Sequence, residues 1–198
     1  DAPAETLRAA QLAARFAGQC VIGFDLAGAE LGFPPSAHID AIDTARDAGL
    51  GITLHAGEAD AGSRVLEAAG LGATRIGHGV NIMKAPNADE QKHWLEKAIY
   101  HGLHFEVCPT SNVHTGTAAS LAAHPLRAMA EAGLSVSVST DNRLMSGITL
   151  TRELQLAHRE NGVSMAALGG MMREAARVSF LPEDVRTAAR EALEAWPQ

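Results

Sequence analysis

Residues 51–58 read Gly-Ile-Thr-Leu-His-Ala-Gly-Glu, a short apolar run that ends in an imidazole and a carboxylic acid. The run predicts a buried strand over 51–56, and the glycine that follows predicts a loop. Enzymes built on a β/α barrel gather their active-site groups at the carboxyl ends of parallel strands. The segment therefore predicts a functional loop at the end of a strand.

Apolar runs of strand type alternate with segments of helical periodicity along the chain. Strands are expected at 20–26, 51–56, 74–78, 104–108 and 135–140. Helices are expected at 3–18, 37–48, 60–69, 88–101, 124–132, 149–160, 164–178 and 182–195. This alternation predicts an α/β fold of parallel βαβ units.

The pattern by itself allows an open doubly wound sheet or part of a barrel. Nothing resembles the GxGxxG turn of a dinucleotide-binding sheet, and polar groups follow at least three different strands, which favours the barrel. The 198 residues fall short of the roughly 250 that a complete (β/α)8 barrel needs.

Composition excludes several classes of function. The net charge of −7 and the scattered basic residues argue against nucleic-acid binding. No apolar stretch approaches the roughly 20 residues of a membrane span, and no signal peptide is visible. Cys20 and Cys108 are not a disulfide framework, so a reducing cytoplasm is the expected location.

His55, His78 and Asp141 are the candidate site residues, because each stands at or just after a predicted strand end. A lone histidine at a strand end is more often structural than a ligand, and an aspartate there can simply cap a turn. His78 is flanked by two glycines, which allow a close approach to the backbone. Three such coincidences at one end of one sheet favour a shared site.

Imidazole nitrogens and a carboxylate oxygen suit Zn²⁺, which in catalytic sites keeps a position open for water. Bound zinc lowers the pKa of that water to about 7, and a nearby histidine can take its proton. Glu58 follows His55 by three residues and could donate a proton to the ring nitrogen of a heteroaromatic substrate. The residues thus predict a zinc hydrolase.

Five collinear motifs resemble the adenosine deaminase family in order and approximate spacing. They are Gly23-Phe24-Asp25-Leu26-Ala27-Gly28, His55-Ala56-Gly57-Glu58, Arg75-Ile76-Gly77-His78-Gly79, Phe105-Glu106-Val107-Cys108-Pro109-Thr110-Ser111-Asn112 and Ser139-Thr140-Asp141-Asn142. The resemblance implies a TIM-type (β/α)8 barrel that uses zinc to convert adenosine and 2'-deoxyadenosine to inosine and 2'-deoxyinosine, with release of ammonia.

The resemblance also implies a role for each site residue. Zinc ligands are His55 and Asp141, the proton donor to purine N1 is Glu58, and the residue that positions and deprotonates the water is His78. Gly28 is implied as the backbone donor to purine N3. Glu106 and Ser111 are implied as supports for the metal carboxylate.

The chain departs from the family pattern in two places. Asn142 stands where the family often has a second aspartate that contacts purine N7, and an amide can donate to that acceptor. The HxH pair that supplies two zinc ligands on the first barrel strand is absent. We therefore expect residues 1–198 to be a single domain that supplies strands 4–8 of the barrel, with strands 1–3 in a missing N-terminal half.

Three functions stay open at this stage. The first is adenosine deaminase, acting on a small purine nucleoside. The second is a related deaminase of adenine, AMP or a modified adenine nucleoside, and the Asp-Leu-Ala-Gly run favours the nucleoside enzyme over it. The third is an inactive half-barrel fragment without bound zinc.

Overall fold

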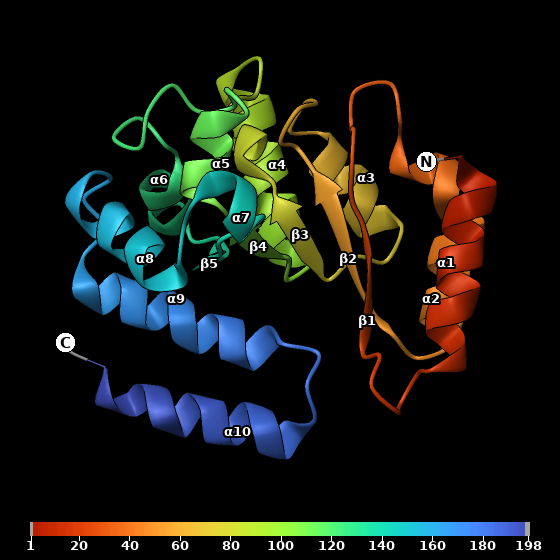
Figure 1. Cartoon of the computed structure of the whole chain (residues 1–198). Helices are drawn as coiled ribbons and strands as arrows, with labels where there is room; N and C mark the ends of the chain where they lie inside the picture. The colour runs from red at the N-terminus through yellow and green to blue at the C-terminus, as the bar shows by residue number, and fades with distance from the viewer. Residues whose placement is uncertain (1, 197–198) are drawn as a thin grey trace. The chain divides into compact units, whose positions relative to one another are not determined.

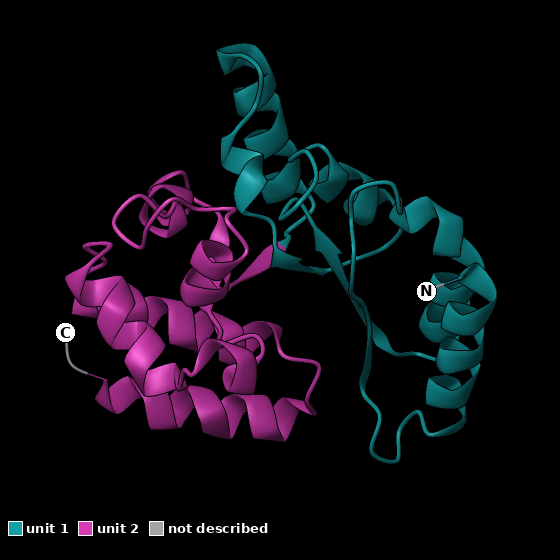
Figure 2. Ribbon diagram, turned by 45° about the horizontal axis from the view of Figure 1, so that its top comes forward, with its two compact units in different colours: residues 1–103 teal, residues 104–198 magenta. Residues whose placement is uncertain are grey.

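The structure, a computed structural model, describes residues 2–196, which divide into two compact units. Unit 1 ends at Leu103 and unit 2 begins at His104 (Figure 2). Each unit carries its own parallel strands, its own helices and its own buried core.

Unit 1 alternates helices and strands from its beginning to its end (Figure 1). In chain order its elements are α1 (Pro3–Arg15), β1 (Gly23–Leu26), the 3-10 helix η1 (Pro35–His38), α2 (Ile39–Asp47), β2 (Gly51–Ala56), α3 (Arg64–Gly70), β3 (Arg75–His78), the 3-10 helix η2 (Val80–Met83) and α4 (Ala88–Tyr100). Helices α1 and α2 pack against each other.

The three strands of unit 1 are parallel and hydrogen-bonded in chain order. Strand β1 pairs with β2 so that Leu26 is opposite Leu54, and β2 pairs with β3 so that Ala56 is opposite His78. Leu54 and Ile76 are fully buried, and each such side chain contributes about 1.5–3 kcal/mol through burial. The shared direction brings the carboxyl ends of all three strands to one edge.

Unit 2 continues the alternation and then becomes helical. Its elements are β4 (His104–Val107), α5 (Pro109–His114), α6 (Leu126–Glu131), β5 (Ser135–Val138), α7 (Arg143–Ser146), α8 (Leu150–Arg159), α9 (Met165–Val178), α10 (Glu183–Ala192) and the 3-10 helix η3 (Leu193–Ala195). Helix α10 runs beside α9 (Figure 1).

Strands β4 and β5 are parallel, with Phe105 opposite Val136, and α9 packs against β5. Phe105 is fully buried in this core. The buried ring of His104 is hydrogen-bonded on both nitrogens, to Ser135 Oγ at 2.8 Å and Ser137 Oγ at 2.9 Å. Both ring nitrogens of this buried histidine are therefore satisfied.

The predicted elements are confirmed, with differences at their ends. Strand β2 has the predicted bounds, whereas the first strand begins at Gly23 and not at Cys20. Helix α5 was not predicted, because Pro109 directly follows the strand expected at 104–108 and proline commonly ends a strand. Proline also suits the first turn of a helix, where its missing N–H costs nothing, and it opens α5 here.

Within residues 2–196, none of the helices combines the length and apolarity needed to cross a membrane.

Candidate active site

Unit 1 brings three of the predicted site residues together where β2 and β3 end. His55 lies within β2, Glu58 is on the loop that follows it, and His78 is the last residue of β3. The His55 and His78 rings are 5.1 Å apart between centroids, at an interplanar angle of 65°. His78 Nε2 lies 3.5 Å from Glu58 Oε2, so an imidazole and a carboxyl are within reach of one substrate.

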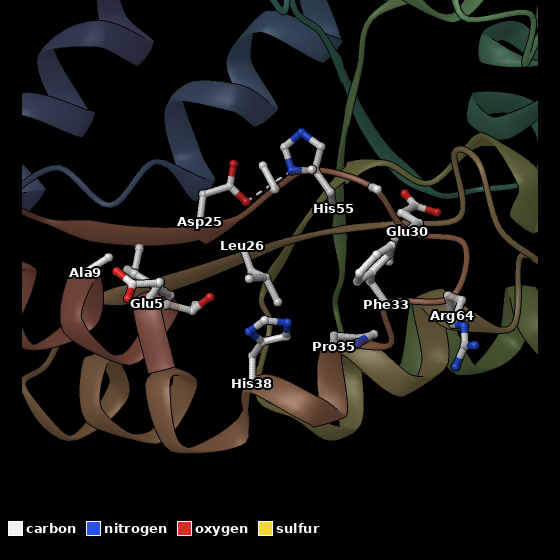
Figure 3. A pocket seen from close by; sticks show the side chains of 16 residues that line it. Glu5, Ala9, Asp25, Leu26, Glu30, Phe33, Pro35, His38, His55 and Arg64 are labelled. Atoms are coloured by element: carbon white, nitrogen blue, oxygen red, sulfur yellow. Dashed lines mark hydrogen bonds and ion pairs between the residues drawn. The ribbon is translucent and has the colours of Figure 1, made fainter. Parts of the chain in front are cut away.

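Asp25 on β1 orients the His55 ring. His55 Nδ1 is 3.1 Å from Asp25 Oδ1, so the ring tautomer that carries its proton on Nδ1 can donate to this carboxyl group. Figure 3 shows both side chains on one side of the strands, with Leu26 and His38 on the other. A carboxylate that fixes a histidine tautomer is a common support for a metal ligand.

Gly77 on β3 leaves space for the same ring. A Cβ added at Gly77 would lie 2.7 Å from His55 Nδ1 and 2.9 Å from its Cε1. Any side chain at position 77 would therefore displace His55. The contact with His55 therefore gives glycine a steric reason at position 77, in addition to the close approach to the backbone that the sequence predicts.

The loop that carries Glu58 is hydrogen-bonded to Asn81, in the 3-10 helix η2 that follows β3. Asn81 Nδ2 donates to Glu58 O at 2.6 Å and to Asp60 O at 2.9 Å, and Asn81 N donates to Gly57 O at 2.8 Å. The Glu58 side chain is 16% exposed. These bonds fix the main chain beneath a partly buried acid.

The loop continues into a charged cluster at the start of α3. Arg64 Nε contacts Asp60 Oδ2 at 2.8 Å, and Arg64 Nη1 contacts Glu67 Oε2 at 2.5 Å. The hydrogen bond from Arg64 lowers the pKa of Asp60, with help from the Ala61 backbone N–H. Burial acts to raise the pKa of Glu67, but hydrogen bonds from Ser36 and Arg64 outweigh it and lower that pKa.

Unit 2 carries four more predicted site residues, on its two strands or shortly after them. Ser111 on α5 donates through Oγ to Asp141 Oδ2 at 2.6 Å, and the family resemblance implies this serine as a support for a metal-binding carboxylate. Glu106 is half-buried on β4. Asn142 caps α7 by accepting from Met145 N at 3.0 Å through Oδ1, and its amide group remains a donor.

His78 and Asp141 share an unusual backbone conformation. Among residues 2–196 they are the non-glycine residues with positive φ, at 60° for His78 and 51° for Asp141. Left-handed backbone costs a non-glycine residue about 1–3 kcal/mol and is concentrated at functional sites. The strain thus falls on two residues that the sequence singled out for their chemistry.

A pocket of about 210 Å³ in unit 1 extends from the end of β1 towards α1 and η1 (Figure 3). Gly28, with a φ of 128° that only glycine adopts readily, lines this pocket together with His55. The buried His38 also lines it, and its Nδ1 has no hydrogen-bond partner. The predicted substrate-binding glycine therefore borders a cavity.

The residues present fit zinc by donor type. In the described part of the chain, no cluster of three or more His, Cys, Asp or Glu side chains is arranged to hold a metal ion. The two predicted ligands, His55 and Asp141, are an imidazole and a carboxylate, and each has the hydrogen-bonded support typical of zinc ligands.

Sequence reasoning missed Asp25 and Asn81 as site residues. Asp25 is a carboxylate inside an otherwise apolar strand, and that polarity was the available signal. Asn81 gave no such signal, because its role depends on how η2 approaches the preceding loop.

The sequence matches a family described as adenosine deaminase over residues 2–196. An adenosine deaminase from Mycobacterium sp. (strain JLS) is 40% identical over 185 residues, which are 90% of this chain and 51% of that protein. This chain spans about half the length of the curated relatives it matches.

Solved structures agree with the predicted fold class, α/β of the TIM-type (β/α)8 barrel. An adenine deaminase from Arthrobacter aurescens is 27% identical, with a TM-score of 0.88 over 98% of this chain and 58% of that one. An N6-mAMP deaminase from arabidopsis is 25% identical, with a TM-score of 0.83 over 98% of this chain and 56% of that one. The extent of these matches, together with the sequence identity above, shows that the chain belongs to the adenosine deaminase family.

Proposed function

We propose that these residues belong to an enzyme that deaminates adenosine and 2'-deoxyadenosine by hydrolysis, giving inosine or 2'-deoxyinosine and ammonia. The observation that carries the proposal is the placement of Glu58 within 3.5 Å of His78, next to the His55 ring. A carboxyl group and two imidazole rings are thus adjacent at the carboxyl ends of two parallel strands, which supports their use as acid, base and metal ligand.

His55 and Asp141 would hold the zinc ion, with orientation from Asp25 and Ser111. Zinc, when bound, supplies the Lewis acidity that activates a water molecule at neutral pH. Further ligands would come from the proposed N-terminal half of the barrel, including strands 1–3 and their HxH pair. The half-length coverage of the relatives supports that proposal.

His78 would position the attacking water and take its proton. Glu58 would donate a proton to purine N1, which makes C6 electrophilic as the new C–O bond forms. The proton taken by His78 would pass to the C6 amino group, which leaves as ammonia as the C6–N bond breaks. The remaining hydroxyl proton would return to Glu58 as the C6 carbonyl forms. Glu58 and His78 are close enough to act on neighbouring atoms of one ring.

Gly28 and Asn142 would recognise the purine edge. The backbone N–H of Gly28 would donate to N3, and its position on the pocket wall supports that role. The Asn142 amide would donate to N7 while its Oδ1 caps α7. Ser111 would hold Asp141, and Glu106 is proposed as a further support. Cytoplasmic location remains a proposal from cysteine usage.

The second candidate is deamination of adenine or of an adenine nucleotide. It is favoured by the likeness to an adenine deaminase and to an N6-mAMP deaminase. The inactive fragment is the third candidate, and it predicts neither zinc binding nor turnover.

The ultraviolet change that accompanies conversion of adenosine to inosine tests the function directly in the complete natural polypeptide. The substrate panel is adenosine, 2'-deoxyadenosine, adenine, AMP and N6-methyl-AMP at matched concentrations. We expect the highest kcat/KM for the two nucleosides. Preference for adenine or a nucleotide would select the second candidate, and no turnover of any substrate would reject the purine deaminase.

A further inference from the structure

Glu30 lies in the loop after β1, and its carboxylate is the acceptor for a row of backbone N–H groups from the loop after β2. Oε2 accepts from Gly57 N at 3.1 Å, Glu58 N at 3.1 Å, Ala59 N at 3.2 Å and Asp60 N at 3.0 Å. Oε1 accepts a second bond from Glu58 N at 3.1 Å. One side chain thus collects four consecutive donors.

Consecutive N–H groups that point to one place form a concave anion-binding site in many proteins. Here a carboxylate of the same chain occupies that place, and charge-assisted hydrogen bonds are roughly twice as strong as neutral ones. Glu30 is half-buried, which limits competition from water.

The carbonyl groups of the same loop are bonded to a different residue, Asn81. Asn81 donates to the carbonyl oxygens of Glu58 and Asp60, so the main chain is bonded through its N–H groups to Glu30 and through its C=O groups to Asn81. With its four N–H groups bonded to Glu30 and the carbonyls of Gly57, Glu58 and Asp60 bonded to Asn81, the main chain of residues 57–60 has little freedom to rotate. The Glu58 side chain leaves the middle of this restrained stretch.

We propose that Glu30 is a positioning residue that holds the loop of residues 57–60, here named the acid loop, so that Glu58 stays within reach of its partner. This proposal rests on the deaminase function proposed above. Glu30 is two residues after Gly28, the proposed donor to purine N3. The same short segment therefore ties the purine-binding backbone to the acid that protonates the purine.

The test is Glu30→Gln in the complete natural polypeptide, because the amide keeps the shape and loses the charge and one acceptor. We expect kcat for adenosine to fall about 100-fold, the scale of an ångström-size misplacement, with a much smaller change in KM. Amide hydrogen exchange at residues 57–60 should quicken in the same variant. Glu96→Gln is the matched control, since Glu96 is exposed on α4 and 3.8 Å from Lys92.

A double variant separates positioning from general damage. If Glu30 acts through Glu58, then adding Glu30→Gln to Glu58→Gln should lower kcat far less than it does in the wild-type background. Independent, multiplying effects would contradict the proposal. Should Glu30→Gln fail to fold, Glu30→Asp keeps the charge on a shorter side chain and is judged by the same measurements.

The outcomes distinguish this proposal from the function. Faster exchange with unchanged kcat would mean that Glu30 holds the loop without serving catalysis, and unchanged exchange would mean that it does not hold the loop, so either result overturns the proposal. A wild-type protein without deaminase activity would instead reject the function. The exchange measurement would then still decide whether Glu30 restrains the acid loop.

Discussion

His78 and Asp141 keep side chains on backbone that glycine would adopt at lower cost. Such conformations persist when the surrounding structure fixes them, and here each residue also has a polar partner: Glu58 for His78 and Ser111 for Asp141. Replacing either residue changes the backbone preference and the chemistry together. Variants at these positions therefore need separate measurements of stability and activity.

Substitutions of the two proposed proton-transfer residues should separate catalysis from metal binding. We expect His78→Ala to lower kcat about 100- to 10,000-fold, because it removes the group that positions and deprotonates the water. Glu58→Gln should nearly abolish turnover, since the amide cannot donate the acid's proton, while bound zinc is retained. Steady-state kinetics and metal analysis check both variants. Near-normal turnover by the His78→Ala variant would show that His78 takes no part in the mechanism. Loss of zinc from the Glu58→Gln variant would show that Glu58 is a zinc ligand or supports one.

Gly77→Ala should damage the site through His55. The new Cβ would lie 2.7 Å from His55 Nδ1, so the ring must leave the position in which that nitrogen contacts Asp25. Loss of such support lowers metal affinity about 10- to 100-fold, which a zinc titration would measure.

Gly70→Ala is the control for Gly77→Ala, because Gly70 ends α3 and a Cβ there would meet nothing within 4 Å. This variant should keep its zinc affinity and gain up to about 1 kcal/mol of stability. Equal zinc affinity in the two alanine variants would show that contact with Gly77 does not position His55.

At the scale of elements, loops between parallel strands and helices carry the predicted chemistry, while the strands and helices hold those loops in place. The acid loop is the best example, because it is bonded to Glu30 after β1, to Asn81 in η2 and, through Asp60, to Arg64 in α3. Three elements of unit 1 thus restrain four residues. Substitutions that remove any of these hydrogen bonds should therefore alter the position of Glu58.

The Arg64 cluster predicts a pH-dependent contribution to stability. The folded-state pKa values of Asp60 and Glu67 are lowered, so their contribution is present above the unfolded-state pKa of about 4 and is lost as pH falls through the folded values. Arg64→Gln should lower the unfolding free energy by about 1 kcal/mol at pH 7 and by progressively less in acid. Denaturant unfolding at pH 7 and pH 3 measures the difference.

The control for the Arg64 experiment is Arg8→Gln, which breaks an ion pair with Glu5 whose side chains are 75% and 58% exposed. Exposed pairs of this kind contribute little, so its effect should be small at both pH values. A pH-independent loss in Arg64→Gln would mean that packing of the arginine stem, and not its charge, stabilises α3.

Single elements could be predicted from the sequence, whereas contacts between distant loops could not. Strand β2 was predicted with its observed bounds, because Gly51 at its start and Gly57 directly after it mark both ends of an apolar run. The Glu30 bonds to the acid loop were not predicted, because they depend on how two loops distant in sequence approach each other. Positive φ at His78 and Asp141 was not predicted either, because aspartate and histidine adopt that conformation more often than other non-glycine residues but usually do not.

At the scale of the whole molecule, zinc should be needed for turnover. A chelator should abolish adenosine deamination by the complete natural polypeptide, and added Zn²⁺ should restore it. The 198-residue chain by itself should bind zinc more weakly, because His55 and Asp141 are its only two proposed ligands. Turnover that survives exhaustive chelation, with metal analysis showing none bound, would contradict the zinc mechanism.

Each of the two units contains one tryptophan. The sequence has two, and Trp94 lies buried on α4 in unit 1, while Trp196 in unit 2 packs against Gly169 and donates through Nε1 to Met165 O at 3.0 Å. Each unit thus carries its own intrinsic fluorophore. Trp94→Phe and Trp196→Phe variants would report the melting of one unit at a time, so fluorescence alone can reveal whether the two halves unfold as one cooperative transition or in succession.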